Sequence, residues 1–202
     1  MLNASAIVAL TNNQSVSEDQ RVLISPALAL SEYEKSGEAS VDLRLGCWFL
    51  SSKLNKVHLL DVSSEQPRNP PGVSKYYVPF GGQFILHPGA FVLAATLEWI
   101  KLPNNLAGLV TGKSSWGRRG LVIETAPGVH PGFGGCLTLE LANVGEVPIA
   151  IYPGLRIAQL FLFPIASHFY ATSQSNFAGR RQPAYSTIKL DGVASALMNS
   201  GR

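Results

Sequence analysis

The chain has 202 residues, of which 46% are hydrophobic and 14% are charged, and its formal net charge is +3 at pH 7. This composition excludes a disordered protein, and the length suits one domain with a substantial core. The mild positive charge suits an anionic small molecule, but it is too weak and too dispersed to indicate nucleic-acid binding.

The cysteines and the apolar runs argue against a disulfide-bonded, secreted or membrane protein. Cys47 and Cys136 are too few for a disulfide framework or a zinc set, and both lie in apolar runs, so we expect buried, reduced thiols. Residues 1–10 lack the basic region of a signal peptide, and no apolar run approaches the roughly 20 residues of a membrane helix. We therefore expect a cytoplasmic protein with no membrane partner.

Along the chain, short runs rich in β-branched and aromatic residues alternate with Gly, Pro and Asn. A short helix is expected within 27–37, a long polar loop at 62–77 and a C-terminal arm from about 172 to 202. The spacing predicts an all-β barrel or sandwich in one domain, residues 1–202, with its core at about 20–171. Strands are expected in the runs 41–52, 56–62, 83–103, 120–125, 136–145, 147–165 and 168–172.

The stretch AGLVTGKSSWGRRG, residues 107–120, matches a permissive P-loop pattern at Gly112, Lys113 and Ser114. A P-loop needs a helix after it, whose backbone N–H groups hold phosphate. Here two glycines and then a β run follow Ser115, and each interior glycine costs a helix about 1 kcal/mol. An ATPase site is therefore excluded, whereas another kind of phosphate site and an ordinary exposed basic turn both remain open.

Several motifs occur in an order that resembles the deoxycytidine triphosphate (dCTP) deaminases and their relatives, the trimeric deoxyuridine triphosphate (dUTP) pyrophosphatases. The resemblance covers most of residues 39–165. It implies a distorted β-barrel or jelly roll of the dUTPase-like type with a few short helices. It also implies a homotrimer with sites between subunits, Mg²⁺ bound through the triphosphate, and an arm that closes over the nucleotide. The motifs are ASVDLRLG, HPGAFVLAATLEWIKLP, GKSSWGRRGL, GVHPGFGGCLTLELANVG and PGLRIAQLFLF.

Glu140 in CLTLELANVG stands at the position where the deaminase branch carries its general acid/base. By this resemblance it shuttles protons while water attacks C4 of cytosine without zinc, and its pKa must be raised toward neutrality. Strand alternation places Leu137, Leu139 and Leu141 on the face opposite to Glu140. A solvent-facing glutamate on an amphipathic strand is the alternative. The H-x-E and P-C-x-x-C signatures of zinc deaminases are absent.

The resemblance also implies the remaining site residues. Ser114 and Arg118 are expected to be catalytic beside Glu140. Lys113 replaces the usual arginine, which keeps the charge but loses the bidentate fork. Gln159 is expected to act more in structure than in catalysis. The expected substrate-binding residues are Lys113, Ser115, Thr125, Ala126, His130, Gln159, Phe177, Arg180 and Arg181.

Three departures from the family pattern affect the substrate contacts. His130 replaces an aspartate of both branches, so it cannot be the anionic base of a pyrophosphatase. Pro127 and Gly128 replace a histidine and an arginine. The arm reads NFAGRRQP, in which Phe177 could still stack on a base and the two arginines could still meet phosphates.

The expected function is zinc-independent hydrolytic deamination of dCTP to dUTP and ammonia, which supplies dUTP for pyrimidine deoxynucleotide synthesis. Alternatives are a catalytically silent or variant-substrate nucleotide-binding homotrimer, or a dUTP pyrophosphatase. Trp48 and Trp99 are expected in the core, whereas Trp116 is a candidate for a trimer contact.

Overall fold

The computed structural model consists mainly of β-strands, which confirms the all-β class. It describes residues 1–13, 15, 20–28, 30–33, 37–52, 72–124, 126–166, 179–186 and 191–199. Within these ranges, no helix has the length and apolar character needed to cross a membrane. The elements are α1 (Ala4–Asn12), β1 (Leu23–Ser25), α2 (Leu30–Tyr33), β2 (Val41–Ser52), β3 (Val73–Tyr77), β4 (Phe84–Leu86), β5 (Phe91–Lys101), β6 (Leu106–Gly112), α3 (Ser114–Gly117), β7 (Leu121–Glu124), β8 (Gly128–Val129), β9 (Gly134–Asn143), β10 (Ile149–Ile151), β11 (Arg156–Pro164) and α4 (Gly192–Asn199).

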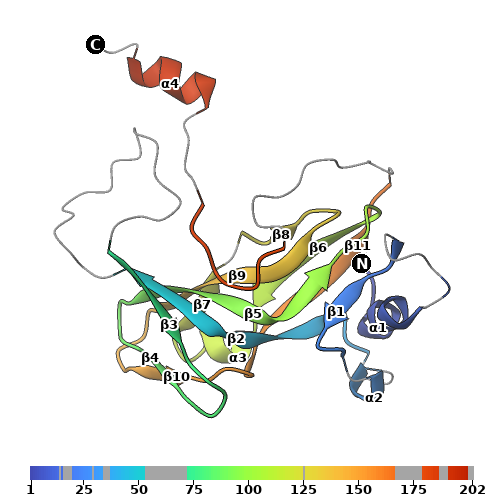
Figure 1. Cartoon of the computed structure of the whole chain (residues 1–202), viewed down its shortest axis with the longest axis horizontal. Helices are drawn as coiled ribbons and strands as arrows, with labels where there is room; N and C mark the ends of the chain where they lie inside the picture. Colours follow the sequence, from blue (N-terminus) through green and yellow to red (C-terminus); the bar gives the residue numbers. More distant parts are fainter. Residues whose placement is uncertain are drawn as a thin grey trace.

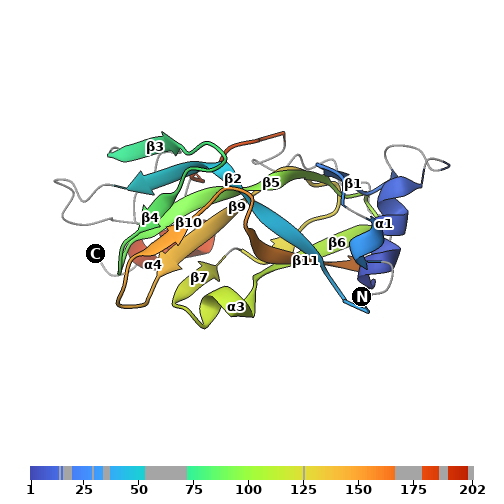
Figure 2. The same cartoon turned by 90° about the horizontal axis from the view of Figure 1, so that it is seen from below.

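The main sheet is antiparallel and strongly curled (Figures 1 and 2). Its strands follow the order β7-β9-β5-β2-β11-β6-β8, with β1 added to β5 and β3 added to β2, and β4 and β10 form a separate pair. Strands β6 and β7 pack closely although they lie far apart along this path. A Cβ built on Gly112 of β6 would lie only 2.9 Å from the Cβ of Ile123 on β7. The sheet thus curls back on itself like a partly closed barrel.

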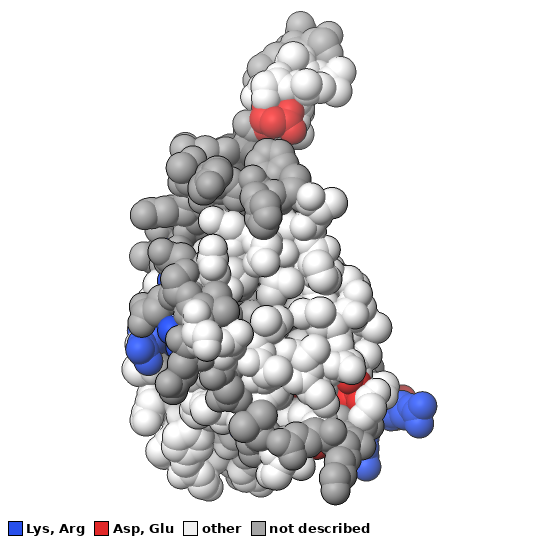
Figure 3. All heavy atoms as spheres, turned by 90° about the vertical axis from the view of Figure 1, so that its right-hand side faces the viewer, with Lys and Arg blue, Asp and Glu red and all other residues white. Residues whose placement is uncertain are grey.

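The core fills the inner face of this curled sheet. Alternating residues of the long strands, such as Leu139 and Leu141 on β9, are fully buried. Helix α1 adds Ile7 and Val8 to the same cluster, although the sequence analysis did not predict this helix. Its start is capped by the Asn3 side chain, which accepts a hydrogen bond of 2.8 Å from the backbone N–H of Ala6. On the face drawn in Figure 3, charged side chains of the described residues form only small patches.

Most predicted strand runs contain observed strands. The run 41–52 coincides with β2, whereas 83–103 contains β4 and β5, and 147–165 contains β10 and β11. The runs 120–125 and 136–145 overlap β7 and β9. The predicted strands at 56–62 and 168–172 lie outside the described residues.

The irregular segments differ more from the predictions. The predicted loop at 62–77 contains strand β3, which pairs along one side with β2 and exposes Lys75, Tyr76 and Tyr77. The polar, proline-rich residues that precede this strand made the whole run resemble a loop in composition. The short helix expected within 27–37 is confirmed by α2, while residues 29 and 34–36 of this run lie outside the described residues. The arm contains helix α4, which was not predicted.

Two expectations about individual side chains are corrected by their burial. Trp48 and Trp99 are half-buried rather than in the core, and Trp48 packs against Tyr77 with ring centroids 4.9 Å apart. Trp116 donates its indole N–H to the Arg156 carbonyl 2.9 Å away, and its place in a trimer contact stays a prediction. Both thiols are free, but only Cys136 is buried, because Cys47 lies on the partly exposed face of β2.

Candidate active site

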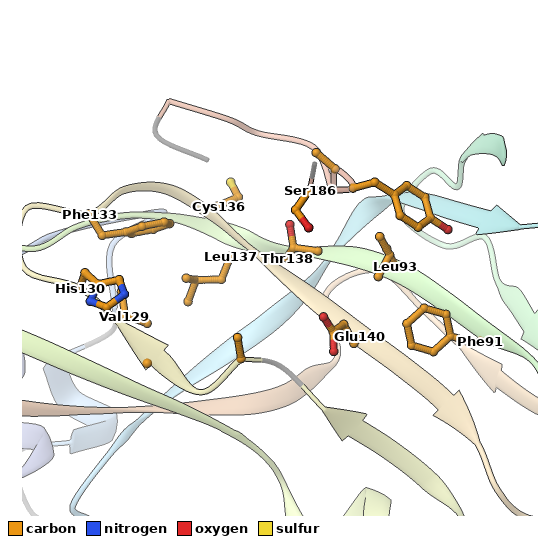
Figure 4. A pocket seen from close by; sticks show the side chains of 14 residues that line it. Phe91, Leu93, Val129, His130, Phe133, Cys136, Leu137, Thr138, Glu140 and Ser186 are labelled. Carbon is orange, nitrogen blue, oxygen red and sulfur yellow. The ribbon is translucent and has the colours of Figure 1, made fainter. Parts of the chain in front are cut away.

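A cavity of about 470 Å³ lies on one side of the sheet and brings together residues from distant parts of the chain. Strands β5, β8 and β9 form its walls, and residues 184–186 of the C-terminal segment complete them. Figure 4 shows His130 and Phe133 toward one end of this cavity, and Glu140 and Phe91 toward the other. The lining residues are Phe91, Leu93, Ala126, Gly128, Val129, His130, Phe133, Cys136, Leu137, Thr138, Glu140, Ala184, Tyr185 and Ser186.

Glu140 is the acidic residue of this lining. It is half-buried on β9, where its register partners are Leu93 on β5 and Glu124 on β7. Burial raises the pKa of the Glu140 carboxyl above its usual range, and the negative charge of Glu124 raises it further. A carboxyl with a raised pKa in a cavity returns an accepted proton less reluctantly at neutral pH than an ordinary carboxylate, because its protonated form is more stable.

The predicted alternation of side chains between the two faces of β9 is observed in part. Leu139 and Leu141 are fully buried in the core as expected, but Leu137 is half-buried and lines the cavity. The cause is an irregularity in the pairing of β5 with β9, where the register shifts between Ala95 and Trp99. At this point the backbone N–H of Leu137 donates to the Thr96 hydroxyl at 2.9 Å instead of continuing the ladder.

Some expected substrate-binding residues do reach this cavity. Ala126 and His130 both line it, and His130 is exposed at its end. The expected residues Thr125 and Phe177 lie outside the described residues. Sequence analysis did not single out Tyr185 or Ser186, which also line the cavity. The aromatic ring of Tyr185 within the predicted arm was the one signal that could have identified it.

The loop that carries Lys113 lies apart from the cavity. Lys113 forms an ion pair of 2.5 Å with Asp42, whose side chain is 10% exposed. Ser114, Ser115 and Arg118 are exposed and do not line the cavity. The sequence predicted no helix after Gly112, but Ser114–Gly117 form one helical turn. This turn ends at Gly117, so a P-loop helix is still not formed.

Gln159 lies near the Lys113 loop rather than near Glu140. It is half-buried on β11, where its register partners are Asp42 on β2 and Thr111 on β6. This position in the middle of three strands favours a structural role, which stays a prediction.

The C-terminal segment 179–186 crosses the sheet next to β9. Gly179 begins it with φ of 76° and donates its N–H to the Gly134 carbonyl at 2.6 Å. The Cys136 N–H donates to the carbonyl of Arg180 at 2.8 Å. Tyr185, further along the segment, has its hydroxyl 2.9 Å from that of Ser52. Arg180 and Arg181 line a second cavity instead of the Glu140 cavity.

The fold matches a known class of solved structures. The crystal structure of 2'-deoxycytidine 5'-triphosphate deaminase from Agrobacterium tumefaciens superposes with a TM-score of 0.57 and 20% identity. The match covers 80% of this chain and 46% of that chain, so this chain spans about half of its length. The fold class is therefore the one that the sequence resemblance implied.

The comparison of sequences is more specific. The family model described as dCTP deaminase-like matches residues 10–165, so the chain belongs to this family. A relative from Dictyoglomus turgidum is 35% identical over 180 residues, which are 86% of this chain and 90% of the relative. A relative from Thermobifida fusca is 41% identical over 160 residues, which are 76% of this chain and 80% of the relative. Both are named "dCTP deaminase, dUMP-forming".

Proposed function

We propose that this protein hydrolytically deaminates dCTP and releases deoxyuridine monophosphate (dUMP). Membership of the dCTP deaminase-like family supports the reaction, and the names of the relatives support the product. The product differs from the dUTP expected from the sequence. Formation of dUMP requires a second hydrolysis, in which water cleaves the bond between the α- and β-phosphates and diphosphate leaves.

The position of Glu140 in the cavity is the observation that carries this proposal. In the deamination, the oxygen of water bonds to C4 of cytosine, the bond from C4 to the amino nitrogen breaks, and ammonia leaves. Glu140 accepts the proton of the attacking water as a carboxylate and delivers it to the departing nitrogen. The raised pKa of Glu140 favours both transfers, because general acid/base catalysis works best when the pKa lies near the working pH.

The rest of the lining suits a flat base. Phe91, Phe133 and Tyr185 contribute aromatic rings, and Thr138 and Ser186 contribute hydroxyl groups. Ring faces favour stacking with a planar base, whereas hydroxyls can donate to or accept from its polar edge. A volume of about 470 Å³ lies within the range of small-molecule sites.

The triphosphate needs positive charges that this lining does not provide, because none of its described residues is Lys or Arg. Ser114, Ser115 and Arg118 are exposed on their loop. We propose that the chain forms a homotrimer in which this loop of one subunit reaches the Glu140 cavity of the next. Lys113 would support the loop through Asp42 while keeping its charge close to the phosphates.

Mg²⁺ would enter this site with the substrate. Among the described residues, no group of three or more His, Cys, Asp or Glu side chains could hold a metal ion. We propose that the triphosphate oxygens bind this cation, whose charge would partly neutralise theirs. No proton transfer above depends on this ion.

Product analysis tests the proposal. The purified protein is incubated with dCTP and Mg²⁺, nucleotides are separated by anion-exchange chromatography, and ammonia is measured in parallel. We expect dUMP and ammonia in equal amounts. Accumulation of dUTP with ammonia would support the deamination but contradict the proposed product. Absence of ammonia would overturn the proposed function.

A further inference from the structure

The loop that carries Ser114 and Arg118 is held to the rest of the fold at both of its ends. At its start, the Lys113 N–H donates to a backbone carbonyl of β11 at 3.0 Å. At its end, the Gly120 carbonyl accepts a hydrogen bond of 2.9 Å from the N–H of Val144, in the turn after β9. The two exposed catalytic candidates therefore lie on a backbone that is fixed on both sides.

Asn143 holds the turn after β9 in place. Its side chain is fully buried, and the amide nitrogen donates to the carbonyls of Leu86 and Val147 at 2.9 and 2.8 Å. Its side-chain oxygen accepts from the Gly145 N–H at 2.9 Å, a local bond of the kind that stabilises turns. One buried side chain thus ties the turn 143–147 to β4 and closes it on itself.

The contact between this turn and the end of the loop leaves no space for a side chain. Gly120 has a φ of 85°, and a Cβ built on it would lie 2.8 Å from the backbone nitrogen of Gly145. A Cβ built on Gly145 would lie 3.6 Å from the carbonyl oxygen of Arg119. Two backbone segments pack directly against each other here, so the position of the turn determines the position of the loop end.

Strands β7 and β9 connect this contact to the proposed general acid/base. Asn143 on β9 is the register partner of Leu121 on β7, and Glu140 lies three residues earlier on β9. Gly120 immediately precedes β7, and helix α3 of the loop lies beside β7 at one edge of the sheet (Figure 2). The same pair of strands therefore holds both Glu140 and the end of the loop.

We propose that Asn143 is a positioning residue for the deamination. Through the turn 143–147 it fixes the end of the loop that brings Ser114 and Arg118 to the Glu140 cavity of the neighbouring subunit. The role of Asn143 rests on the proposed function, in which Glu140 and this loop of different subunits form one site. Because small displacements of an orienting group cost large factors in rate, the turn acts on catalysis without touching the substrate.

The kinetics of Gly120→Ala test this role at the contact itself, because Asn143→Ala would remove three hydrogen bonds from the buried side chain and endanger the fold. We expect kcat/KM for deamination of dCTP to fall about 100-fold in Gly120→Ala. Gly81→Ala is the matched control, because Gly81 has a φ of 84° but a Cβ there would meet nothing within 4 Å. Gly145→Ala disturbs the same contact more mildly and should show a smaller loss, and thermal unfolding checks that all three variants are folded.

Mixed oligomers distinguish positioning from a general loss of structure. Glu140→Gln and Arg118→Gln subunits, each expected to be inactive alone, are coexpressed with different tags. The intact loop of the first can then serve the intact Glu140 of the second, and we expect ammonia release to recover. Gly120→Ala added to the Glu140→Gln subunit should abolish this recovery, whereas the same change in the Arg118→Gln subunit should leave most of it.

The unchanged protein is assayed in parallel, which separates the two possible failures. No ammonia from the unchanged protein would overturn the proposed function and the role of Asn143 together. Equal kcat/KM in Gly120→Ala and Gly81→Ala, or equal effects of Gly120→Ala in the two kinds of subunit, would overturn the role of Asn143 alone. Mixed oligomers that do not recover activity would also overturn it, because the loop would then not serve a neighbouring subunit.

Discussion

Glu124 and Glu140 are direct register partners on the neighbouring antiparallel strands β7 and β9. Two carboxylates in this position share one face of the sheet and repel each other. Glu140 is half-buried in the cavity and Glu124 is exposed, so burial is the main cause of the raised pKa of Glu140 and repulsion adds to it. The pair thus tunes the group that we propose as the general acid/base.

Replacement of Glu124 by Gln should shift the pH profile of deamination. Because Glu140 must be ionised to accept a proton from water, its raised pKa places the acidic limb of kcat at a higher pH than an ordinary glutamate would. Removal of the Glu124 charge lowers the pKa of Glu140, so the limb should move to lower pH. Glu146→Gln, in the exposed turn after β9, is the control. An unmoved limb in Glu124→Gln would show that Glu124 has no such influence.

The contact between β6 and β7 can be tested at Gly112. A Cβ at this position would lie 2.9 Å from the Cβ of Ile123, which cannot move without its backbone. We expect Gly112→Ala to destabilise the fold by about 1–3 kcal/mol in urea unfolding. Gly117→Ala is the control, because a Cβ at Gly117 would meet nothing within 4 Å and alanine favours the helical turn there. Equal stability of both variants would argue against the close approach of the two strands.

The sequence predicted the strand-rich fold because strand period and turn residues are local signals. Strand β2 and the face of Leu139 and Leu141 follow from them directly. Leu137 could not be placed, because its position depends on the register shift opposite Thr96, a relation between two strands. Tyr185 was missed for a similar reason. Only the path of segment 179–186 over the sheet brings it to the cavity.

Breaking the ion pair between the half-buried Arg44 and the buried Glu98 should make the free energy of unfolding depend on pH. Glu98 is fully buried, and its two carboxylate oxygens accept from the Arg44 backbone at 2.8 Å and guanidinium at 3.0 Å. Arg44→Met removes the opposite charge and leaves only the backbone hydrogen bond, at a cost of up to about 3 kcal/mol.

The sign of the pH effect follows from the pKa of Glu98, which burial already raises in the folded protein. Without Arg44 it rises further, while the unfolded value stays ordinary. Stability of the variant should therefore fall as pH rises between these two values. Urea unfolding at about pH 5 and pH 8 should show the larger loss at the higher pH. The double variant Arg44→Met with Glu98→Gln should remove this dependence, and an equal loss at both pH values in the single variant would contradict the prediction.

Lys113 and Asp42 should be energetically coupled if Lys113 supports its loop from within the fold. Their 2.5 Å ion pair is mostly shielded from water, with side chains 26% and 10% exposed. In a double-mutant cycle with Lys113→Gln and Asp42→Asn, we expect a coupling of about 0.5–3 kcal/mol in the free energy of unfolding. Additive losses would instead identify Lys113 as a cation that contributes nothing to stability through Asp42.

The role of Glu140 is tested by comparing Glu140→Gln with the unchanged protein, with ammonia release from dCTP and binding of dCTP measured on the same samples. Glutamine keeps the shape of the side chain but cannot accept the proton of water. We expect ammonia release to fall by about 100-fold or more while the affinity for dCTP changes little. Ammonia release that persists in Glu140→Gln at the rate of the unchanged protein would contradict this role.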